Sequence, residues 1–124
     1  MKKSLKCYLS NLWFRAVLLL FTMVLISSLF IVGAQPIVVG LFPHPIDKIV
    51  HATFYGGLTT LVWLALGMRR ELTVFFSVVL IAVIDEWHQA YLPGRSSDFM
   101  DLFVDVMSIA LVIMVVCIFQ KNDK

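Results

Sequence analysis

The sequence contains little charge and few cysteines. Only 15% of its 124 residues are charged, whereas 60% are apolar. Its mean hydropathy of +0.93 exceeds what a soluble core of this size can bury. The small number of basic residues argues against nucleic-acid binding. The composition therefore predicts a membrane protein.

Common catalytic motifs are also missing. No serine or cysteine lies in a recognisable nucleophile motif, no glycine-rich loop could hold a phosphate, and no His-Glu-x-x-His sequence occurs. The two cysteines, Cys7 and Cys117, are not typical of a disulfide framework. We expect both on the cytoplasmic side of a membrane, where thiols stay reduced. The sequence thus offers a candidate site but does not name a reaction.

Four apolar segments predict an all-α integral membrane protein with four transmembrane helices in a single domain, residues 1–124. The helices cover about residues 14–33, 47–68, 72–92 and 98–119, each long enough to cross about 30 Å of hydrocarbon. The first segment has an alternative interpretation, a signal peptide cleaved after Ala34. Its apolar run is longer than a usual signal core, which favours a retained helix.

Proline and glycine mark the connections. Residues 35–46 hold three prolines and a glycine and cannot form one regular helix, but Pro45 suits the first turn of the next helix. Pro93 and Gly94 fit the central positions of a type II turn. Within the second helix, Gly56-Gly57 followed by Thr59-Thr60 offers a small-residue patch for close helix packing.

The distribution of basic residues predicts the orientation. Eight of the ten lysines and arginines lie in the two tails, at Arg15 or in the Arg69-Arg70 turn, all on one predicted side. The positive-inside tendency makes that side cytoplasmic, with both termini inside a bacterial inner membrane. Six of the eight acidic residues then lie at the outer side.

The outer side carries a polar cluster. Residues 85–105 contain five carboxylates, one arginine and one histidine between apolar runs. Helical spacing places polar residues on one face of each of three helices. The three faces hold Asp98, Asp101, Asp105 and Ser108; Asp85, His88 and Gln89, with Glu86 at the edge; and Asp47 and His51, beside Lys48 and Tyr55.

Two of these acids lie deep in their helices. Asp85 and Asp105 are each predicted about 10 Å below a helix end on helices joined by a short turn. A charged group in the bilayer costs up to about 3 kcal/mol, so these groups must face one another, a cation or water. We expect the two carboxylates to approach within a few ångströms, so that one carries a proton near neutral pH or the two share a cation.

These motifs resemble the VanZ-like family of small bacterial membrane proteins. The resemblance covers residues 45–110 and rests on Asp47-Lys48-x-x-His51, Asp85-Glu86-x-x-Gln89 and Pro93-Gly94-Arg95 with Asp101. It implies a cell-envelope setting, because the family's name member is associated with teicoplanin resistance. The chain departs from the family's pattern at Asp105, where Asn is common, and at Ser108-Ile109-Ala110, which replaces a glycine-containing stretch.

The candidate residues fall into three sets. Candidates for acid–base catalysis are Asp85, Glu86, His51, His88 and Asp101. Candidates for ligand binding are Lys48, Arg95, Gln89, Asp47 and Tyr55, and Arg95 is also expected to neutralise Asp101 or Glu86. No cofactor is evident, but Asp85, Asp101, Asp105 and His51 are candidate ligands of a divalent cation.

Several functions remain open at this stage. The leading hypothesis is a cell-envelope role, with low-level lipoglycopeptide resistance through binding of, or action on, a lipid-anchored ligand. The alternative is an enzyme that acts on a phospholipid or polyprenyl-phosphate headgroup. A proton-coupled transporter ranks third and would require a homo-oligomer. A purely structural ion-pair network also accounts for the charged residues.

Overall fold

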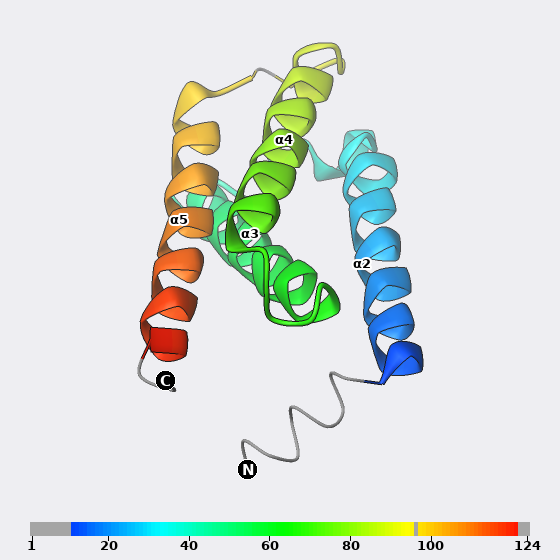
Figure 1. The fold of residues 1–124 in the computed structure, drawn as a ribbon. Coiled ribbons are helices and arrows are strands. Elements are labelled where there is room, and N and C mark those ends of the chain that lie inside the picture. Colours follow the sequence, from blue (N-terminus) through cyan, green and yellow to red (C-terminus); the bar gives the residue numbers. More distant parts are fainter. Residues whose placement is uncertain (1–10, 96, 122–124) are drawn as a thin grey trace.

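The structure, a computed structural model, describes residues 11–95 and 97–121. This part of the chain forms four α-helices, one 3-10 turn and no strand, which confirms the all-α prediction. The elements are α2 (Leu12–Gly33), η1 (Pro36–Val38), α3 (Ile46–Ala65), α4 (Glu71–Ala90) and α5 (Phe99–Lys121), as Figure 1 shows. Cys7, Lys2, Lys3, Lys6 and Lys124 lie outside the described residues.

The predicted helix boundaries agree with the observed ones within three residues. The largest difference is the end of α3, which stops at Ala65 instead of residue 68. Gly67, Met68 and Arg70 have positive φ angles of 80°, 59° and 68°, and this left-handed backbone ends the helix. The predicted type II turn is confirmed, because Gly94 has φ 78° and the Arg95 N–H donates to the Leu92 carbonyl at 3.2 Å.

Helix α3 occupies the centre of the bundle and contacts each of the other three helices. In Figure 1 it passes obliquely behind α4, with α5 and α2 on either side. The core around it is apolar and includes Leu58 of α3, Val74 and Val78 of α4 and Ile109 of α5, all fully buried. These contacts fix the positions of the polar residues nearer the N-terminal end of α3.

The close packing of α3 on α5 depends on Gly56. A Cβ atom at this position would lie 2.9 Å from Ser108 Oγ, which donates a 2.6 Å hydrogen bond to the Ala52 carbonyl. The adjacent Gly57 faces open space, since a Cβ there would meet nothing within 4 Å. Of the two glycines in the predicted small-residue patch, Gly56 therefore forms the contact between the helices and Gly57 does not.

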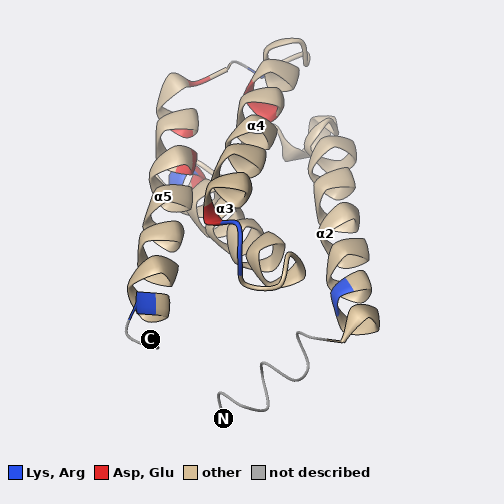
Figure 2. Cartoon of the chain, viewed as in Figure 1, with Lys and Arg blue, Asp and Glu red and all other residues tan. Residues whose placement is uncertain are grey.

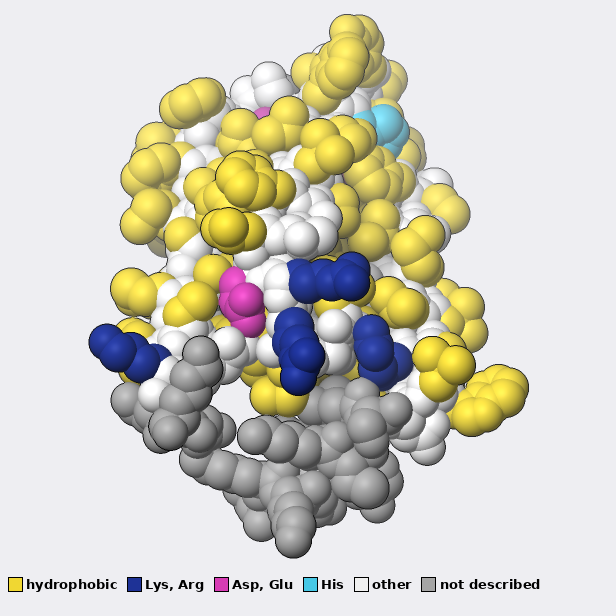
Figure 3. All heavy atoms as spheres, viewed as in Figure 1, with side chains coloured by type: hydrophobic (Ala, Val, Ile, Leu, Met, Phe, Trp, Pro, Cys, Tyr) yellow, Lys and Arg dark blue, Asp and Glu magenta, His cyan; other side chains and the backbone are white. Residues whose placement is uncertain are grey.

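The outside of the bundle is largely apolar. Large side chains such as Trp13, Ile37 and Phe99 are about four-fifths exposed, and Figure 3 shows apolar side chains over much of one face. Helices α2 and α5 are long and apolar enough to cross a membrane. Helices α3 and α4 have 20 residues each, but their combination of mean hydropathy and charged residues does not mark them as membrane spans in the same way. The structure thus supports two of the four predicted spans.

The two ends of the bundle differ in charge. Figure 2 shows acidic residues toward one end of α4 and α5 and basic residues at the start of α2, the α3–α4 turn and the end of α5. The basic end is tied together by hydrogen bonds: Arg15 Nε donates to the Ala65 carbonyl at 2.9 Å, and the Gln120 amide donates to the Met68 carbonyl at 3.0 Å. The acidic end holds the site described next.

Candidate functional site

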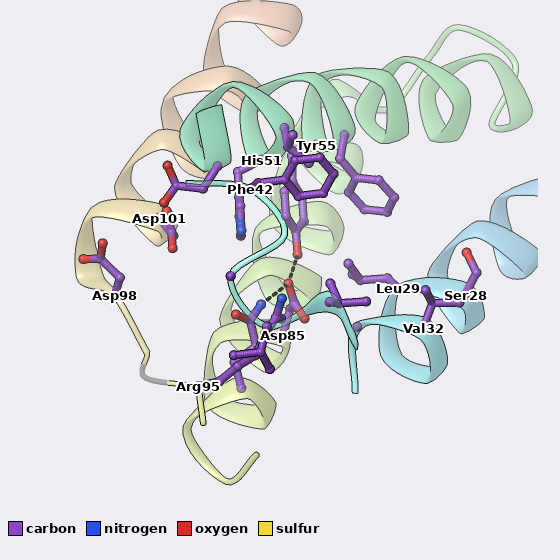
Figure 4. A pocket seen from close by; sticks show the side chains of 18 of the residues that line it. Ser28, Leu29, Val32, Phe42, His51, Tyr55, Asp85, Arg95, Asp98 and Asp101 are labelled. Atoms are coloured by element: carbon purple, nitrogen blue, oxygen red, sulfur yellow. Dashed lines mark hydrogen bonds between the residues drawn. The ribbon is translucent and has the colours of Figure 1, made fainter. Parts of the chain in front are cut away.

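A cavity of about 500 Å³ opens at the acidic end of the bundle (Figure 4). One wall is apolar and comes from the end of α2 and from the connector between α2 and α3, residues 34–45. It includes Leu29, Val32 and Phe42. The opposite wall is polar and comes from α3, α4, the α4–α5 loop and the start of α5. Its polar residues are Asp47, His51, Tyr55, Asp85, Gln89, Arg95, Asp98 and Asp101.

Asp85 is the most deeply placed charged residue of the cavity wall, with only 3% of its surface exposed. Its Oδ2 accepts hydrogen bonds from the Tyr55 hydroxyl at 3.1 Å and the Gln89 amide at 3.0 Å. Gln89 lies one helical turn after Asp85, and Tyr55 reaches it from α3. Both donors are uncharged, so they orient the carboxylate without neutralising it.

His51 forms a second pair with Asp105. Its Nδ1 lies 3.1 Å and 3.2 Å from the two Asp105 oxygens, and Asp105 is fully buried. The His51 ring also stacks on Tyr55, with ring centroids 6.3 Å apart. Each deep carboxylate therefore has a partner of its own, and among the described side chains no hydrogen bond joins Asp85 to Asp105. The expectation that these two acids share one proton or cation gains no support from this arrangement.

Lys48 gathers three carboxylates into what we call the Lys48 cluster: Lys48, Asp47, Asp98 and Asp101. Its Nζ lies 2.6 Å from Asp98 Oδ2 and 3.5 Å from Asp47 Oδ2, and it also donates to Asp101 Oδ1. Lys48 and Asp101 are 15% and 13% exposed, so this ion pair is partly shielded from solvent. The cluster joins the start of α3 to the start of α5.

Asp98 has two roles in this cluster. Its Oδ1 accepts a 2.9 Å hydrogen bond from the Met100 N–H, so it caps the N-terminus of α5, while its Oδ2 pairs with Lys48. The hydrogen bond from Lys48, helped by that from Met100, lowers the pKa of the Asp98 carboxyl. Asp98 therefore combines a helix cap with an ion pair.

Arg95 is not the counter-ion that the sequence predicted. The structure pairs Asp101 with Lys48, and Glu86 Oε2 instead accepts a 2.9 Å hydrogen bond from the Asp98 N–H. Within residues 11–95 and 97–121, no carboxylate lies within ion-pair distance of Arg95. The prediction was wrong because helical spacing could not show that α3 brings Lys48 against α5. Arg95 lines the cavity with its charge uncompensated.

Two predicted site residues lie away from the cavity. His88 packs edge-on against Phe30 of α2, with ring centroids 5.4 Å apart, and does not line the cavity. Glu86 does not line this cavity and instead borders a smaller pocket with Trp87 and Phe99. Of the polar residues predicted on one face of α4, only Asp85 and Gln89 line the cavity.

Comparison with known proteins gives a single match. The VanZ/LLP1 family matches residues 4–120, nearly the whole chain. The chain belongs to the VanZ/LLP1 family. No curated protein and no solved structure matches it. The resemblance drawn from the three motifs is confirmed, and those motifs supply most of the polar wall of the cavity.

The predicted metal ligands of this VanZ/LLP1 protein are engaged in separate contacts. Asp101 binds Lys48, Asp105 binds His51, and Asp85 binds Tyr55 and Gln89. Among the described residues, no group of three or more His, Cys, Asp or Glu side chains is arranged to hold a metal ion. A divalent cation stays a prediction.

The apolar wall of the VanZ/LLP1 cavity was missed at the level of sequence. Ser28, Leu29 and Val32 are part of an unbroken apolar helix, and nothing distinguishes them from side chains that face lipid. Residues 35–46 gave a partial signal, because their prolines and glycine exclude one regular helix although the segment is largely apolar. Only the packing of α2 on α3 shows that both segments face the polar residues.

The resulting site can bind an amphipathic molecule. Its volume falls within the range of small-molecule sites, about 300–1,000 Å³. The apolar wall suits hydrocarbon, and the polar wall offers a carboxylate, a guanidinium, a histidine and a hydroxyl. Because His51 is oriented by Asp105, it could also accept or donate a proton.

Proposed function

We propose that this VanZ/LLP1 protein binds the headgroup of a lipid-anchored ligand at the outer leaflet of a bacterial inner membrane. The observation that carries the proposal is the cavity, which joins an apolar wall from α2 and the connector to a polar wall from α3 and α4. A ligand with a charged head and a hydrocarbon tail would match both walls.

The membrane placement rests on composition and charge. All four helices cross the bilayer in this proposal, with the basic end and both termini in the cytoplasm. The exposed apolar side chains would face lipid, whereas the buried carboxylates of α4 and α5 lie inside the bundle. The cavity then opens near the outer headgroups, and its charged residues are not exposed to hydrocarbon.

The physiological role we propose is in the cell envelope, including low-level resistance to lipoglycopeptides such as teicoplanin. Binding of a lipid-anchored ligand would withhold it from the antibiotic, or the antibiotic itself would enter the cavity through its acyl chain. Membership of the VanZ/LLP1 family supports the envelope setting.

The proposed binding role of the cavity can be tested with a substitution that occupies part of its volume. Gly33 lines the cavity, has no positive φ angle, and has open space at its Cβ position, so we expect the side chain of Gly33→Leu to take up cavity volume. Gly57→Leu is the matched control, because Gly57 also faces open space but does not line the cavity. We expect Gly33→Leu to abolish both lipid co-purification, measured by mass spectrometry, and any teicoplanin resistance of the expressing strain. Equal lipid content and resistance in the two variants would contradict the binding role.

A second candidate function is supported by the pairing of His51 with Asp105. A histidine held by a carboxylate at the edge of a lipid-binding cavity is a candidate general base, which favours an enzyme acting on a phospholipid or polyprenyl-phosphate headgroup. An enzyme would change the lipid profile of cells that express the protein, and His51→Gln would restore the original profile. A binding protein would retain the lipid without forming product.

A further inference from the structure

The cavity contains charged groups that the protein itself leaves without counter-ions. Lys48 is not one of them, because its ammonium group contacts Asp47, Asp98 and Asp101. Three carboxylates around one ammonium leave no positive charge there for an anionic ligand. The remaining fixed charges of the cavity wall are Asp85 and Arg95.

Asp85 has one oxygen free for a ligand. Its Oδ2 accepts both hydrogen bonds that the side chain receives, and no donor in residues 11–95 and 97–121 reaches Oδ1. The residue is 3% exposed and lines the cavity. A carboxylate this buried is costly unless a cation or further donors complete its surroundings. The vacant oxygen therefore favours a positively charged donor within the cavity.

The side chain of Arg95 is a hydrogen-bond donor without an acceptor in the described part of the chain. Its guanidinium forms no hydrogen bond or ion pair with the described part of the chain, although it lies on the cavity wall after the Pro93-Gly94 turn. Guanidinium groups bind phosphate and carboxylate through paired hydrogen bonds. A ligand in this cavity would thus meet an acceptor at Asp85 and a donor at Arg95 (Figure 4).

We propose that the ligand is a zwitterionic lipid whose headgroup carries a primary ammonium and a phosphate, of the phosphatidylethanolamine type. The ammonium binds Asp85 Oδ1, the phosphate binds Arg95, and the acyl chains lie against the apolar wall at Leu29, Val32 and Phe42. This proposal rests on the proposed function and specifies its ligand class.

The hydrogen-bonding capacity of Asp85 and the aromatic residues of the cavity lining favour a primary ammonium group. A primary ammonium donates three N–H bonds and can approach a carboxylate oxygen within hydrogen-bond distance, whereas a trimethylammonium group donates none. Trp, which dominates sites for quaternary ammonium, is absent from the cavity lining. The aromatic residues there are Phe42, Phe54, His51 and Tyr55, and Tyr55 uses its hydroxyl to hold Asp85.

The test is a binding comparison on the purified full chain in detergent, by native mass spectrometry. The probes are short-chain phosphatidylethanolamine, its N-methyl and N,N-dimethyl forms, phosphatidylcholine, phosphatidylglycerol and free phosphoethanolamine. We expect phosphatidylethanolamine to bind about tenfold or more tightly than phosphatidylcholine or phosphatidylglycerol, with affinity falling as methyl groups are added. Because the methylation series changes only the ligand, it stays informative even where a variant fails to fold.

Two variants test which residue binds the ammonium of the headgroup and which binds its phosphate. Asp85→Asn should remove the preference for phosphatidylethanolamine over phosphatidylglycerol, and Arg95→Gln should weaken binding of both. Glu71→Gln and Arg69→Gln are matched controls, because each removes the same charge outside the cavity lining, at the α3–α4 turn, and both should bind as the wild type does.

The outcomes separate this inference from the function on which it rests. Binding of phosphatidylglycerol as tight as that of phosphatidylethanolamine would overturn the zwitterion but leave a lipid-binding protein. Equal affinity for phosphoethanolamine and the lipid would overturn the lipid in favour of a soluble zwitterion. An Asp85→Asn/Arg95→Gln double variant that binds as the wild type does would show that neither residue binds the headgroup and would overturn the inference. If no lipid binds, the proposed function itself fails.

Discussion

Lys48 Nζ on α3 lies 2.6 Å from Asp98 Oδ2 at the start of α5, fifty residues further along the chain. The same ammonium group contacts Asp47 and Asp101, so one lysine pairs with three acids and neutralises one of their charges. This relationship changes the expected roles of the two outer cations. Lys48 joins α3 to α5, whereas Arg95 has no ion-pair partner in residues 11–95 and 97–121.

Loss of Lys48 should therefore harm the fold more than loss of Arg95. Lys48→Gln leaves three neighbouring carboxylates without a cation, and we expect it to reduce the free energy of unfolding by about 1–3 kcal/mol, given the partial exposure of the cluster. Arg95→Gln should change it by less than about 0.5 kcal/mol. Denaturant unfolding in detergent micelles measures both. Equal losses for the two variants would contradict this division of roles.

The ion pair of Asp98 predicts an acid-dependent stability. The pKa of its carboxyl is lowered in the folded protein from the usual 3.8, so the stabilisation is fully present above that value and is lost as pH falls through the folded pKa. Asp98→Asn removes the charge but keeps a good cap residue. The difference in melting temperature between wild type and variant should be constant from neutral pH to about pH 5 and should shrink below about pH 4. A difference that grows on acidification would contradict the pairing.

Adjacent glycines should respond differently to a methyl group. Gly56→Ala places a Cβ 2.9 Å from Ser108 Oγ. We expect a loss of about 1–3 kcal/mol, because either Ser108 gives up its hydrogen bond to the Ala52 carbonyl or α3 and α5 move apart. Gly57→Ala meets nothing within 4 Å and should be neutral or stabilising by up to about 1 kcal/mol. Thermal unfolding of the two purified variants makes the comparison. The close contact is disproved if both alanines are tolerated equally.

The two deep carboxylates should differ in their importance for function. Asp105→Asn keeps an oxygen that can accept from His51 Nδ1, and it introduces the residue expected here in the family, so abundance and function should be retained. Asp85→Asn keeps an acceptor for Tyr55 and Gln89 but removes the charge that faces the cavity. We expect normal abundance and lost function, measured by teicoplanin resistance or lipid profile per amount of membrane protein. The reverse result would make Asp105 the working group.

Cysteine labelling tests the four-span arrangement. In a chain carrying Cys7→Ser and Cys117→Ser, Ser97→Cys at the acidic end should react with a membrane-impermeant thiol reagent in intact cells. Thr73→Cys, in the first turn of α4 at the opposite end, should react only after the membrane is permeabilised. Labelling of Thr73→Cys from outside would place the Arg69-Arg70 turn outside and contradict the predicted topology. In the unaltered chain, Cys7 should likewise stay unlabelled from outside.

The sequence by itself determined the elements and most of the polar residues. Apolar runs and proline and glycine positions placed the four helices within three residues, because helix length and termination are local properties. Helical spacing put Asp85 with Gln89, and Asp47 with His51, on common faces, and these four residues line the cavity. The family followed from the same motifs.

Only the tertiary structure decided which residues meet. Spacing along one helix says nothing about the rotation of its neighbours. The sequence therefore paired Arg95 with Asp101 or Glu86, whereas Lys48, 53 residues before Asp101, forms the ion pair with it. For the same reason the sequence grouped His88 with Asp85, although His88 packs on Phe30. The apolar wall of the cavity had no signature at all, because an apolar side chain looks the same in a sequence whether it faces lipid, core or ligand. Partner and register are set by packing between helices, and within residues 11–95 and 97–121 that packing leaves Asp85 and Arg95 on the cavity wall without an ion pair.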